Sequence, residues 1–534
     1  MTEHAWHSEQ WNQLKQEPDK VWDMVVVGGG ITGAGILREA SRLGLQVLMV
    51  EKRDFSWGTS SRSSKLVHGG LRYLKEGRML LTRDAVKERE RLLNECGDLV
   101  TPLPFLIAAY RDRSPGKWSF SVALAIYNLI ARQWERIFYP KTEFKMMAPH
   151  INRVELESGM RYRDAQTDDS RLVLRLIFEA KREGAITLNY TTASPPQRKD
   201  GKIEGLSLRN ELNGETCFVR SKMVVNATGI WVNNMRPKVL TRLRPLRGSH
   251  LVFPAWRLPV AQAVMMIHPV DGRPLFLLPW EGVTLFGTTD LDHDGDLNQE
   301  ARISSAEVRY LLEAIAIALP KLDIKQADII ASYAGIRPVI SHGENVAPSK
   351  ESRDHQIWDD QGLLSITGGK LTTFRMMAFD LLKKARPYLP ELKLDKSTPL
   401  FTVPRPQWPQ RTDLTAEVKK RLLGRYGPDA GHVAEAAEEG ELERIQGTHT
   451  LWVEVRWGAR MEGVTRLDDL MLRRVRLGLL LPGGGRDHMQ RIAQICEEEL
   501  GWSDERMARE EQAYLELWKS CYSVPDELEN DEPD

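Results

Sequence analysis

One stretch of the sequence, residues 24–51, limits the possible folds more than any other. It begins with a β-branched apolar run and continues into the pattern G-x-G-x-x-G, made by Gly28, Gly30 and Gly33. Apolar residues at helical spacing follow, and a second apolar run ends at Glu51. A strand, a glycine turn, a helix, a second strand and an acid in this order are typical of a βαβ unit that binds a dinucleotide.

Each residue type in this unit has a physical role. Gly28 permits a tight turn, Gly30 lets the backbone approach a pyrophosphate, and Gly33 lets the helix pack close to the strand. The start of the helix, which includes Ile31 and Thr32, offers unpaired N–H groups to the phosphates. We therefore predict that these five residues bind the cofactor.

The acid after the second strand indicates which dinucleotide is bound. Glu51 lies 18 residues beyond Gly33, where a carboxylate can accept hydrogen bonds from both ribose hydroxyls of an adenosine. A 2′-phosphate would be repelled there, so NADP is disfavoured, although Lys52 and Arg53 weaken that repulsion. We predict that Glu51 and Lys52 contact the cofactor.

A polar loop further along the chain favours FAD over NAD. The sequence GTSSRSSK at 58–65 is rich in hydroxyls, whereas a simple NAD dehydrogenase would continue into another crossover helix. Hydroxyls and backbone amides of such a loop can wrap the pyrophosphate and the ribityl chain of FAD. The alternative is a serine-rich surface loop. The cofactor contacts predicted here are Thr59, Ser60, Ser61, Ser63, Ser64, Lys65 and Gly70.

Two later segments have the same character. A β-branched strand ends at Ala227, Thr228 and Gly229, and another strand leads through Gly368 and Gly369 into a helix. Small residues at the carboxyl end of a strand let a cofactor lie close to the sheet. Either segment alone could be a structural turn, but together with the first unit they predict one long cofactor that crosses one sheet. Further contacts are predicted from Gly369, Lys370, Leu371 and Thr372.

Composition excludes several other classes of protein. The 534 residues carry 74 Lys and Arg against 74 Asp and Glu, so no excess of positive charge indicates nucleic-acid binding. The first 20 residues lack the apolar run of a secretory signal, and no run reaches the ~18 apolar residues that span a bilayer. The four cysteines are scattered and are predicted to be reduced thiols. We expect a cytoplasmic protein that lies at the periphery of the cytoplasmic membrane.

The motifs of the chain resemble those of a known family. VVGGGITGAGI, TSSRSSKLVHGGLRYL, DDSRLVL, VVNATGIWV, LRGSHLVFP, LFGTTD, YAGIRP and GGKLTTFR occur in the order seen in the FAD-dependent glycerol-3-phosphate dehydrogenases. The resemblance covers about residues 20–390, and residues 467–482 resemble the helical domain that many members append. It implies an α/β fold with a Rossmann-like FAD-binding domain of the glycine-oxidase and D-amino-acid-oxidase type, a β-rich substrate domain and a C-terminal helical domain.

The resemblance also implies an activity. Members of this family oxidise sn-glycerol 3-phosphate to dihydroxyacetone phosphate, with hydride transfer from C2 of the substrate to N5 of FAD. The electrons then pass to a quinone in the membrane, and no metal is expected. Alternatives stay open: an oxidase that uses oxygen on this substrate, a related flavoprotein oxidase with another small anionic substrate, or a flavin-bound regulatory protein without turnover.

Positions shared with the family identify candidate substrate residues. A phosphate monoester needs fixed cations, and the planar fork of arginine binds phosphate through two hydrogen bonds. We predict that Arg72, with Tyr73 beside it, and Arg353 hold the phosphate. Arg337 and Lys370 are expected near the reacting alcohol and the flavin, where a cation stabilises the anionic reduced ring.

Oxidation of the alcohol also needs a group that removes the hydroxyl proton. His250 in RGSHLVF is the favoured candidate, and the second candidate, His68 in LVHGG, is alternatively expected to pack under the flavin. Thr288 in LFGTTD is expected to hydrogen-bond substrate. For any one of these side chains the alternative is a structural role, as a buried histidine or in a surface salt bridge.

The domains of this fold are discontinuous in sequence. We assign 20–110, 155–245 and 335–395 to the FAD-binding domain, and 111–154 and 246–334 to the substrate domain. Residues 400–520 are predicted to form a helical domain, and 521–534 an acidic disordered tail.

Local patterns predict further elements. Ser304 or Ser305 is expected to cap a helix in the substrate domain, and a Thr465-x-x-Asp468 pattern is expected to start a continuous helix that ends at the PGGG of 482–485. Residues 117–141 are apolar and aromatic with cations at both ends, a composition that suits a helix lying on a membrane surface. The alternatives for this segment are a helix buried in the substrate domain and a contact within a homodimer.

Overall fold

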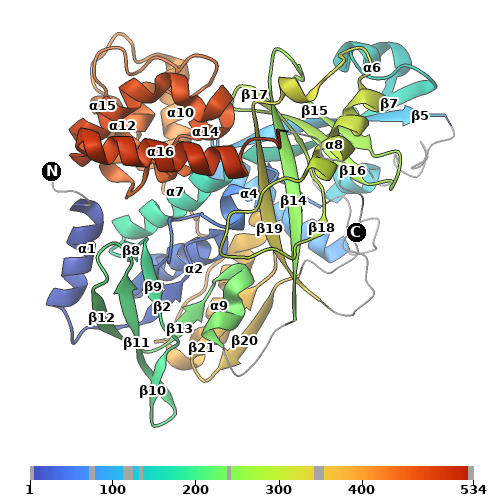
Figure 1. The fold of residues 1–534 in the computed structure, drawn as a ribbon. Coiled ribbons are helices and arrows are strands. Elements are labelled where there is room, and N and C mark those ends of the chain that lie inside the picture. The colour runs from blue at the N-terminus through green and yellow to red at the C-terminus, as the bar shows by residue number, and fades with distance from the viewer. Residues whose placement is uncertain are drawn as a thin grey trace.

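The structure is a computed structural model that describes residues 5–70, 79–111, 124–130, 136–236, 242–341, 354–403 and 405–526. The strands in these ranges form three sheets, and the C-terminal part is helical (Figure 1). In Figure 1 these helices, coloured orange to red, lie above α7 and beside β14 and β17. They therefore contact both the part of the chain that contains α7 and the part that contains β14 and β17.

A six-stranded sheet carries the glycine pattern. Its order is β20-β21-β13-β2-β3-β8, in which β20 runs antiparallel to β21 and the other neighbours are parallel. β2 is buried along its whole length, as a β-branched strand in the middle of a parallel sheet usually is. The strands are β2 (Met24–Val27), β3 (Val47–Val50), β8 (Ile186–Leu188), β13 (Val224–Asn226), β20 (Gln356–Asp360) and β21 (Leu363–Thr367).

Helices cover one face of this sheet and a five-stranded sheet covers the other. Met24 and Val26 pack with the helices, whereas Val25 and Val27 pack against α1 and the smaller sheet. The helices of the first face are α2 (Ile31–Arg42), α7 (Asp169–Arg182) and α9 (Phe374–Ala385), whereas α1 (Ala5–Gln16) lies on the other face with the smaller sheet. The smaller sheet consists of β1 (Val21–Trp22), β9 (Thr191–Ala193), β10 (Gln197–Lys199), β11 (Lys202–Asn210) and β12 (Thr216–Ser221).

A ten-stranded sheet forms the second half of the molecule. Its order is β18-β14-β17-β16-β15-β5-β7-β4, with β19 paired to β14 and β6 paired to β7. The strands are β4 (Leu66–Val67), β5 (Val100–Tyr110), β6 (Phe138–Pro140), β7 (Leu156–Thr167), β14 (Leu243–Pro254), β15 (Ala263–Ile267), β16 (Pro274–Trp280), β17 (Val283–Gly287), β18 (Leu291–Asp292) and β19 (Ala331–Ile340). Against it pack α4 (Met79–Glu95), α6 (Lys141–Met147) and α8 (Ser305–Ala318), of which α8 begins with the predicted cap at Ser304.

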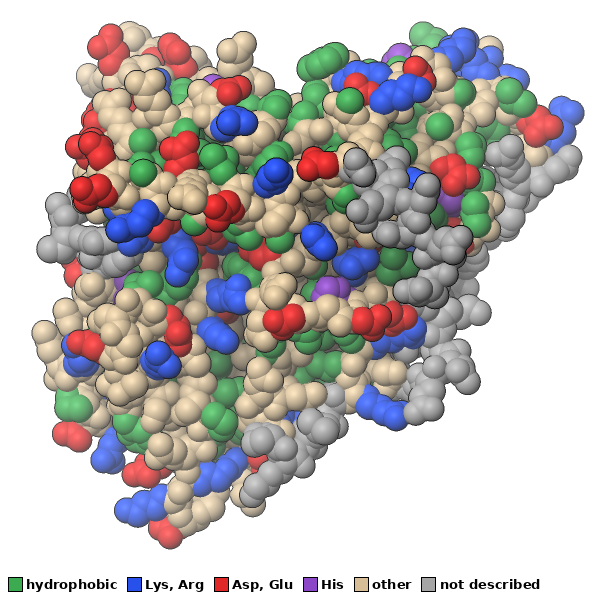
Figure 2. Space-filling view, in the orientation of Figure 1, with side chains coloured by type: hydrophobic (Ala, Val, Ile, Leu, Met, Phe, Trp, Pro, Cys, Tyr) green, Lys and Arg blue, Asp and Glu red, His purple; other side chains and the backbone are tan. Residues whose placement is uncertain are grey.

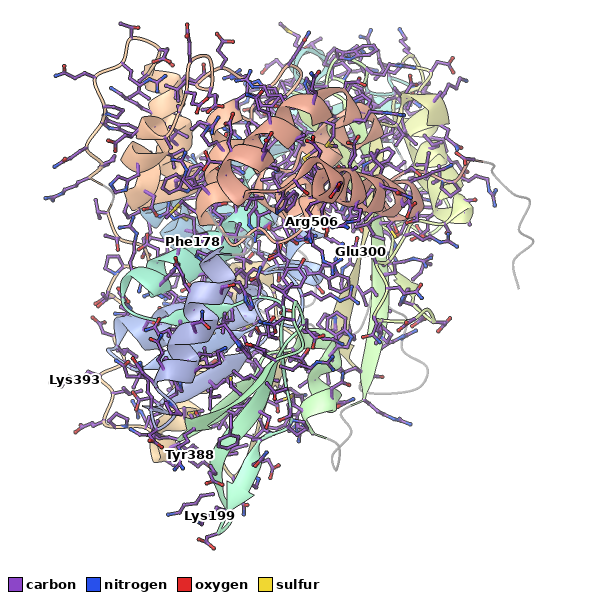
Figure 3. All side chains as sticks on the ribbon, turned by 60° about the vertical axis from the view of Figure 1, so that its left-hand side comes forward. Phe178, Lys199, Glu300, Tyr388, Lys393 and Arg506 are labelled. Carbon is purple, nitrogen blue, oxygen red and sulfur yellow. The ribbon has the colours of Figure 1, made fainter. Side chains whose placement is uncertain are left out.

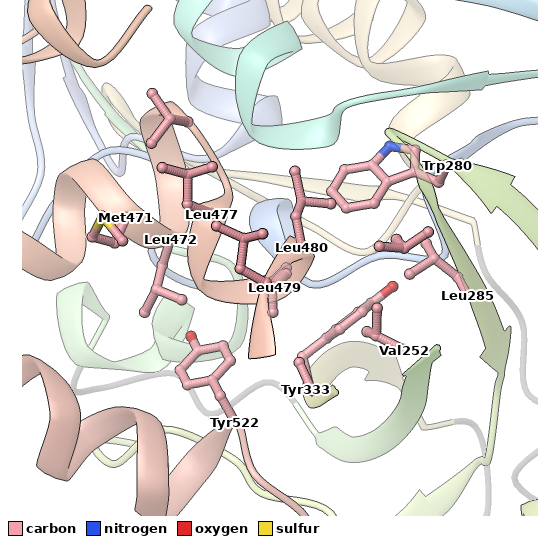
Figure 4. Close-up of a cluster of buried hydrophobic side chains, with 14 of the residues drawn as sticks. Val252, Trp280, Leu285, Tyr333, Met471, Leu472, Leu477, Leu479, Leu480 and Tyr522 are labelled. Atoms are coloured by element: carbon pink, nitrogen blue, oxygen red, sulfur yellow. The ribbon is translucent and has the colours of Figure 1, made fainter. Parts of the chain in front are cut away.

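The helical part shares a hydrophobic core with the ten-stranded sheet. Figure 4 shows Leu477, Leu479 and Leu480 next to Tyr333 and Trp280 of the sheet. In Figure 3, Phe178, Glu300 and Arg506 mark the junction of the helical part with the rest of the chain. The helices are α10 (Ala416–Tyr426), α11 (Ala430–Glu435), α12 (Trp452–Met461), α13 (Leu467–Asp469), α14 (Leu477–Leu480), α15 (Met489–Leu500) and α16 (Asp504–Cys521).

The sheets divide the chain differently from the predicted domain boundaries. β5 pairs along its whole length with β7, and β19 pairs along its whole length with β14. All four strands belong to the ten-stranded sheet, although the boundaries at 110, 155 and 335 placed β5, β7 and part of β19 in the FAD-binding domain. β5 is an interior strand although it contains Pro102 and Pro104, and proline is rare in such strands.

The predicted continuous helix between Thr465 and the PGGG turn is broken. α13 passes into a π-helical turn, Leu470–Arg474, and Arg476 adopts a left-handed conformation with φ of 65° before α14 begins. The cap also differs from the prediction, because the carboxylate of Asp469 accepts the N–H groups of Thr465 and Arg466 at 2.9 Å. The break lets buried arginines of this segment reach partners far away in the chain. Arg473 and Arg474 bind Asp54, and Arg476 binds Asp169.

The predicted tail starts later than residue 521. α16 continues to Cys521, and Tyr522 is buried, with its carbonyl accepting the N–H of Ser332 at 2.7 Å. Residues 527–534 lie outside the described ranges, as do 117–123 and 131–135 of the apolar segment. Within the described ranges, none of the helices combines the length and the apolar character needed to cross a membrane.

Candidate active site

The carboxyl ends of four parallel strands meet at one edge of the six-stranded sheet. Gly28 follows β2, Ala227 follows the neighbouring β13, Gly368 follows β21 on the far side of β13, and Glu51 follows β3. The three glycine-marked strand ends, distant in sequence, are therefore adjacent in space. This edge is where open α/β sheets bind their ligands.

Two glycines at this edge are required by close backbone contacts. A Cβ on Gly28 would lie 2.5 Å from the carbonyl oxygen of Ala227, and one on Gly33 would lie 1.9 Å from that of Gly28. Gly30 is different, because a Cβ there would meet only Ser60 within 4 Å. α2 starts directly after Gly30 with no side-chain cap and no acid in its first turn. The residues of this helix start fit a pyrophosphate, and binding by Gly30, Ile31 and Thr32 stays a prediction.

Glu51 is held at the same edge by backbone hydrogen bonds. Its carboxylate accepts the N–H of Gly29 at 2.7 Å and that of Arg53 at 2.9 Å. Burial raises the pKa of Glu51, and these two hydrogen bonds act in the opposite direction. Lys52 next to it is exposed. The acid predicted to bind the adenosine ribose therefore lies beside the glycine turn.

The polar loop at 58–65 has two kinds of contacts. Ser60 Oγ accepts the N–H of Ile31 at 2.9 Å, which ties the loop to the start of α2. Ser63 and Lys65 bond instead to the buried carboxylate of Asp169, through Ser63 Oγ at 2.7 Å and Lys65 Nζ at 2.8 Å. These two side chains have partners within the protein, and their contact with the cofactor stays a prediction.

The third glycine-marked segment lies against the end of this loop region. The N–H of His68 donates to Thr372 Oγ1 at 3.1 Å, and Thr367 Oγ1 donates to the carbonyl of Gly229 at 2.9 Å. The segment 367–372 therefore contacts both His68 and Gly229. These contacts bring together predicted residues from all three parts of the FAD-binding sequence.

His250 on β14 is buried where the loop meets the ten-stranded sheet. Its Nε2 lies 2.9 Å from Ser64 Oγ, and its ring stacks on Tyr333 with centroids 4.7 Å apart. Burial, followed by the nearby charges of Arg337 and Lys65, holds the pKa of His250 well below its usual 6.5. Nδ1 makes no hydrogen bond within the described residues. The imidazole is thus neutral near pH 7 and able to accept a proton.

Arg337 on β19 is the cation next to this histidine. Its Nη1 lies 2.6 Å from Asp290 Oδ1, and its Nη2 donates to Thr288 Oγ1 at 3.2 Å. Its position depends on Gly248, because a Cβ there would lie 2.4 Å from Arg337 Nη2. Three predicted residues, His250, Arg337 and Thr288, therefore share one site.

Glu307 supports the strand ends around this site. Its carboxylate accepts Ser249 Oγ at 2.8 Å and Thr289 Oγ1 at 2.6 Å, and it pairs with Arg247 Nη2 at 2.9 Å. The same residue closes the capping box of α8. One buried carboxylate thus connects β14, the end of β17 and the start of a helix.

Sequence reasoning missed several residues of the site. Tyr333, Asp290 and Asp169 all lie in the motifs YAGIRP, LFGTTD and DDSRLVL, but nothing in those motifs assigned them a role. The capping pattern was the only signal for Glu307. Three predicted substrate residues, Arg72, Tyr73 and Arg353, lie outside the described ranges.

Two family descriptions match the chain. Residues 23–375 match the family described as FAD dependent oxidoreductase. Residues 402–507 match the family described as the C-terminal domain of alpha-glycerophosphate oxidase. The first range contains the site described above, and the second contains most of the helical part.

Relatives with known names match most of the chain. The aerobic glycerol-3-phosphate dehydrogenase of Staphylococcus haemolyticus is 33% identical over 490 residues, which are 86% of this chain and 87% of the relative. The protein of that name from Staphylococcus aureus strain MRSA252 is 32% identical over 482 residues, 85% of this chain and 86% of the relative.

Solved structures match as well. The glycerol-3-phosphate dehydrogenase from Bacillus halodurans complexed with FAD has a TM-score of 0.75 and 26% identity, covering 97% of this chain and 98% of the other. Glycine oxidase from Geobacillus kaustophilus, at 20% identity, shares the fold with a TM-score of 0.52 and covers 70% of this chain and 96% of its own.

Proposed function

The chain belongs to the family of FAD-dependent oxidoreductases, and from this premise we propose that it oxidises sn-glycerol 3-phosphate to dihydroxyacetone phosphate. The predicted cofactor, enzyme class and fold are confirmed by the family match and by the structural relatives. The substrate is proposed from the names of relatives at 33% identity and from one observation in the structure. That observation is the neutral, buried imidazole of His250 beside the guanidinium of Arg337.

These two side chains fit the two charges that the reaction must handle. When bound, FAD supplies the hydride acceptor. We propose that His250 takes the hydroxyl proton of the substrate, directly or through Ser64 Oγ, which lies 2.9 Å from Nε2. Arg337, oriented by Asp290, and Lys370 are proposed to stabilise negative charge on the reacting alcohol and on the reduced ring. Thr288, which accepts from Arg337, is proposed to hydrogen-bond substrate.

The remaining predicted residues keep their proposed roles. Arg72, Tyr73 and Arg353 are proposed to hold the phosphate, and His68 to lie near the flavin. Glu51, Gly30 and the loop at 58–65 are proposed to hold the two halves of FAD.

The electron acceptor is proposed to be a membrane quinone. The second candidate is oxygen, and one observation favours it: the C-terminal match is to a domain described from alpha-glycerophosphate oxidase.

The proposed attachment to the membrane draws support from exposed apolar side chains around the ten-stranded sheet. Figure 2 shows hydrophobic side chains among Lys and Arg side chains at the α6 end of the molecule, at the upper right. Among the described residues between the strands of this sheet and in α6, the large hydrophobic side chains with high exposure include Met146, Trp256, Val270, Val154 and Leu129. We propose peripheral attachment there, on the cytoplasmic side, and a homodimer as the competing use of these side chains.

The decisive experiment is anaerobic mixing of the FAD-loaded protein with glycerol 3-phosphate. The proposal expects loss of the oxidised flavin absorbance, whereas glycerol and glycine leave the spectrum unchanged because they lack the phosphate. Flavin that stays oxidised with glycerol 3-phosphate would refute the proposed substrate. In air, stoichiometric peroxide during turnover would select oxygen as the acceptor, and its absence together with reduction of a soluble quinone would select the quinone.

A further inference from the structure

The helical part reaches the candidate active site through buried arginines. Arg476 Nη2 donates to the carbonyl of Ser61 at 2.7 Å and to Asp169 Oδ1 at 2.9 Å. Its side chain is 1% exposed, and its Nη1 donates to the carbonyl of Leu472 at 2.6 Å. One guanidinium thus connects its own helical segment, the first turn of α7 and the loop at 58–65.

Asp169, which binds Arg476, also binds the loop at 58–65 directly. Besides Arg476, its carboxylate accepts the N–H of Ser63 at 2.9 Å, Ser63 Oγ at 2.7 Å and Lys65 Nζ at 2.8 Å. Lys65 Nζ also donates to the carbonyl of Ser61 at 2.6 Å. Both backbone and side chains of Ser61–Lys65 are therefore fixed by one buried set of charges.

The fixed loop is the one that contacts His250. Ser64 lies between the two residues bound to Asp169, and its hydroxyl meets His250 Nε2. Tyr333, which stacks on His250, donates its hydroxyl hydrogen bond to the carbonyl of Ser63 at 3.0 Å. The placement of Ser64 against the imidazole therefore depends on contacts that begin at Arg476.

Backbone geometry gives independent support. Arg476 and Lys65 both have positive φ, 65° and 60°, although residues with a Cβ rarely adopt this region. These two residues donate to the same carbonyl, that of Ser61. Strained residues persist where surrounding contacts determine them, and they cluster at functional sites. A glycine would fit the backbone at 476 without strain, so the side chain is what the position requires.

We propose that Arg476 is a positioning residue for the oxidation, through which the helical part holds Ser61–Lys65 so that Ser64 stays aligned with His250. This assigns a function to the C-terminal part of the chain beyond hydrophobic packing. It rests on the proposed role of His250 for its catalytic consequence, but the fixing of the loop itself can be measured without substrate.

The test compares Arg476→Gly with a matched control, using the full FAD-loaded chain. Glycine suits the left-handed backbone, so this variant removes the side chain without adding strain. The control is Arg456→Gln, because Arg456 is equally buried and its carboxylate partners all lie within the helical part, at Glu438, Glu441, Glu498 and Glu499. Arg476→Lys tests whether a charge alone restores the contacts.

The first readout is hydrogen exchange of the segment 57–68, followed by mass spectrometry. Arg476→Gly should exchange there about tenfold faster than the unmodified protein, and Arg456→Gln should not. The second readout is the rate constant of flavin reduction at saturating glycerol 3-phosphate. It should fall about 10- to 100-fold in Arg476→Gly, partly recover in Arg476→Lys, and stay within about twofold in Arg456→Gln, because small misplacements of reacting groups cost this much.

Two results would overturn the proposal. Unchanged exchange at 57–68 in Arg476→Gly would show that the loop does not depend on Arg476. Faster exchange with an unchanged reduction rate would show that the contact has no catalytic consequence. If the unmodified protein itself is not reduced by glycerol 3-phosphate, the proposed substrate fails, and the exchange measurement still decides whether Arg476 fixes the loop.

Discussion

At the scale of single residues, the chemistry of the candidate site depends on how His250 is surrounded. Its ring is buried, lies near Arg337 and Lys65, and stacks on Tyr333. Each of these neighbours disfavours or fails to stabilise the charged form, so the imidazole is neutral at working pH. The sequence identified Arg337 from its position in a motif that resembles the family's, and His250 as a histidine suited to accept the hydroxyl proton. It did not identify Asp169 or Tyr333, whose partners are distant in sequence.

His250→Gln should lower the rate constant of flavin reduction by glycerol 3-phosphate about 10²- to 10⁴-fold, since it removes the proton acceptor. FAD should remain bound with an ordinary absorbance spectrum. The matched control is His268→Gln, because His268 is also buried but stacks on Tyr310 away from the site. A normal reduction rate in His250→Gln would rule out the assigned role.

The pH profile should depend on Arg337. Because the pKa of His250 is lowered, the imidazole stays neutral as the pH falls to about 6.5, and the rate of flavin reduction should decline only at lower pH. Arg337→Gln removes a charge that lowers this pKa, so the acid decline should move to higher pH. The control is Arg244→Gln, which breaks the ion pair between Arg244 on β14, the strand of His250, and Asp292 on β18. An acid decline that stays in place or moves to lower pH in Arg337→Gln would contradict the cause given for the pKa.

At the scale of elements, the sequence predicted what local periodicity determines. The βαβ unit and the cap of α8 follow from apolar periodicity, a glycine turn and a capping pattern within a few residues. The break within 465–481 has a different origin. Arg473 and Arg474 bond to Asp54, at 2.5 and 2.7 Å, more than 400 residues earlier in the chain. No local pattern shows such a partner, so the sequence predicted one straight helix.

The ion pairs between these elements determine how the stability of the fold changes at low pH. Arg474 and Arg473 hold the pKa of Asp54 at about 2, and arginine neighbours hold those of Asp168 and Glu454 at about 2 as well. Since these values are lowered from 3.8 and 4.5, the carboxylates contribute stability that is complete above about pH 4.5 and is lost as the pH falls towards 2.

Arg474→Gln should therefore move acid unfolding to higher pH, because it leaves Asp54 buried with one arginine fewer. Removing one partner of a buried pair costs about 3–5 kcal/mol, so the thermal midpoint at pH 7 should also fall. Far-UV circular dichroism against pH and calorimetry measure the two effects. Arg411→Gln, which breaks the more exposed pair with Asp413, should change both by much less. Equal effects of the two substitutions would refute the importance of the buried pairs.

At the scale of the whole molecule, the helical part contacts both the half built on the six-stranded sheet and the half built on the ten-stranded sheet. The six-stranded sheet carries the edge proposed to bind FAD, and the ten-stranded sheet carries His250 and Arg337. The ten-stranded half also exposes large apolar side chains, with Met146 83% and Trp256 81% exposed. Phe144, two residues before Met146, and Leu258, two residues after Trp256, belong to the same buried hydrophobic cluster. The two exposed side chains are therefore attached to one continuous core.

The double substitution Met146→Ser with Trp256→Ser should reduce co-sedimentation with anionic lipid vesicles severalfold, because interfacial binding scales with buried apolar area. Flavin content and reduction by glycerol 3-phosphate should not change. Val403→Ser, at a residue 70% exposed beside the helical part, is the control and should bind vesicles normally. Unchanged sedimentation of the double variant would place the attachment elsewhere.

The contacts between residues 473–476 and residues 54–61 have a consequence for biosynthesis. Arg473, Arg474 and Arg476 leave the ribosome more than 400 residues after Asp54 and Ser61, which they bind. During synthesis, Asp54 therefore has these guanidinium partners only after residues 473 and 474 have been made. A polypeptide that ends before residue 473 therefore lacks the guanidinium partners of Asp54 and of the Ser61 carbonyl.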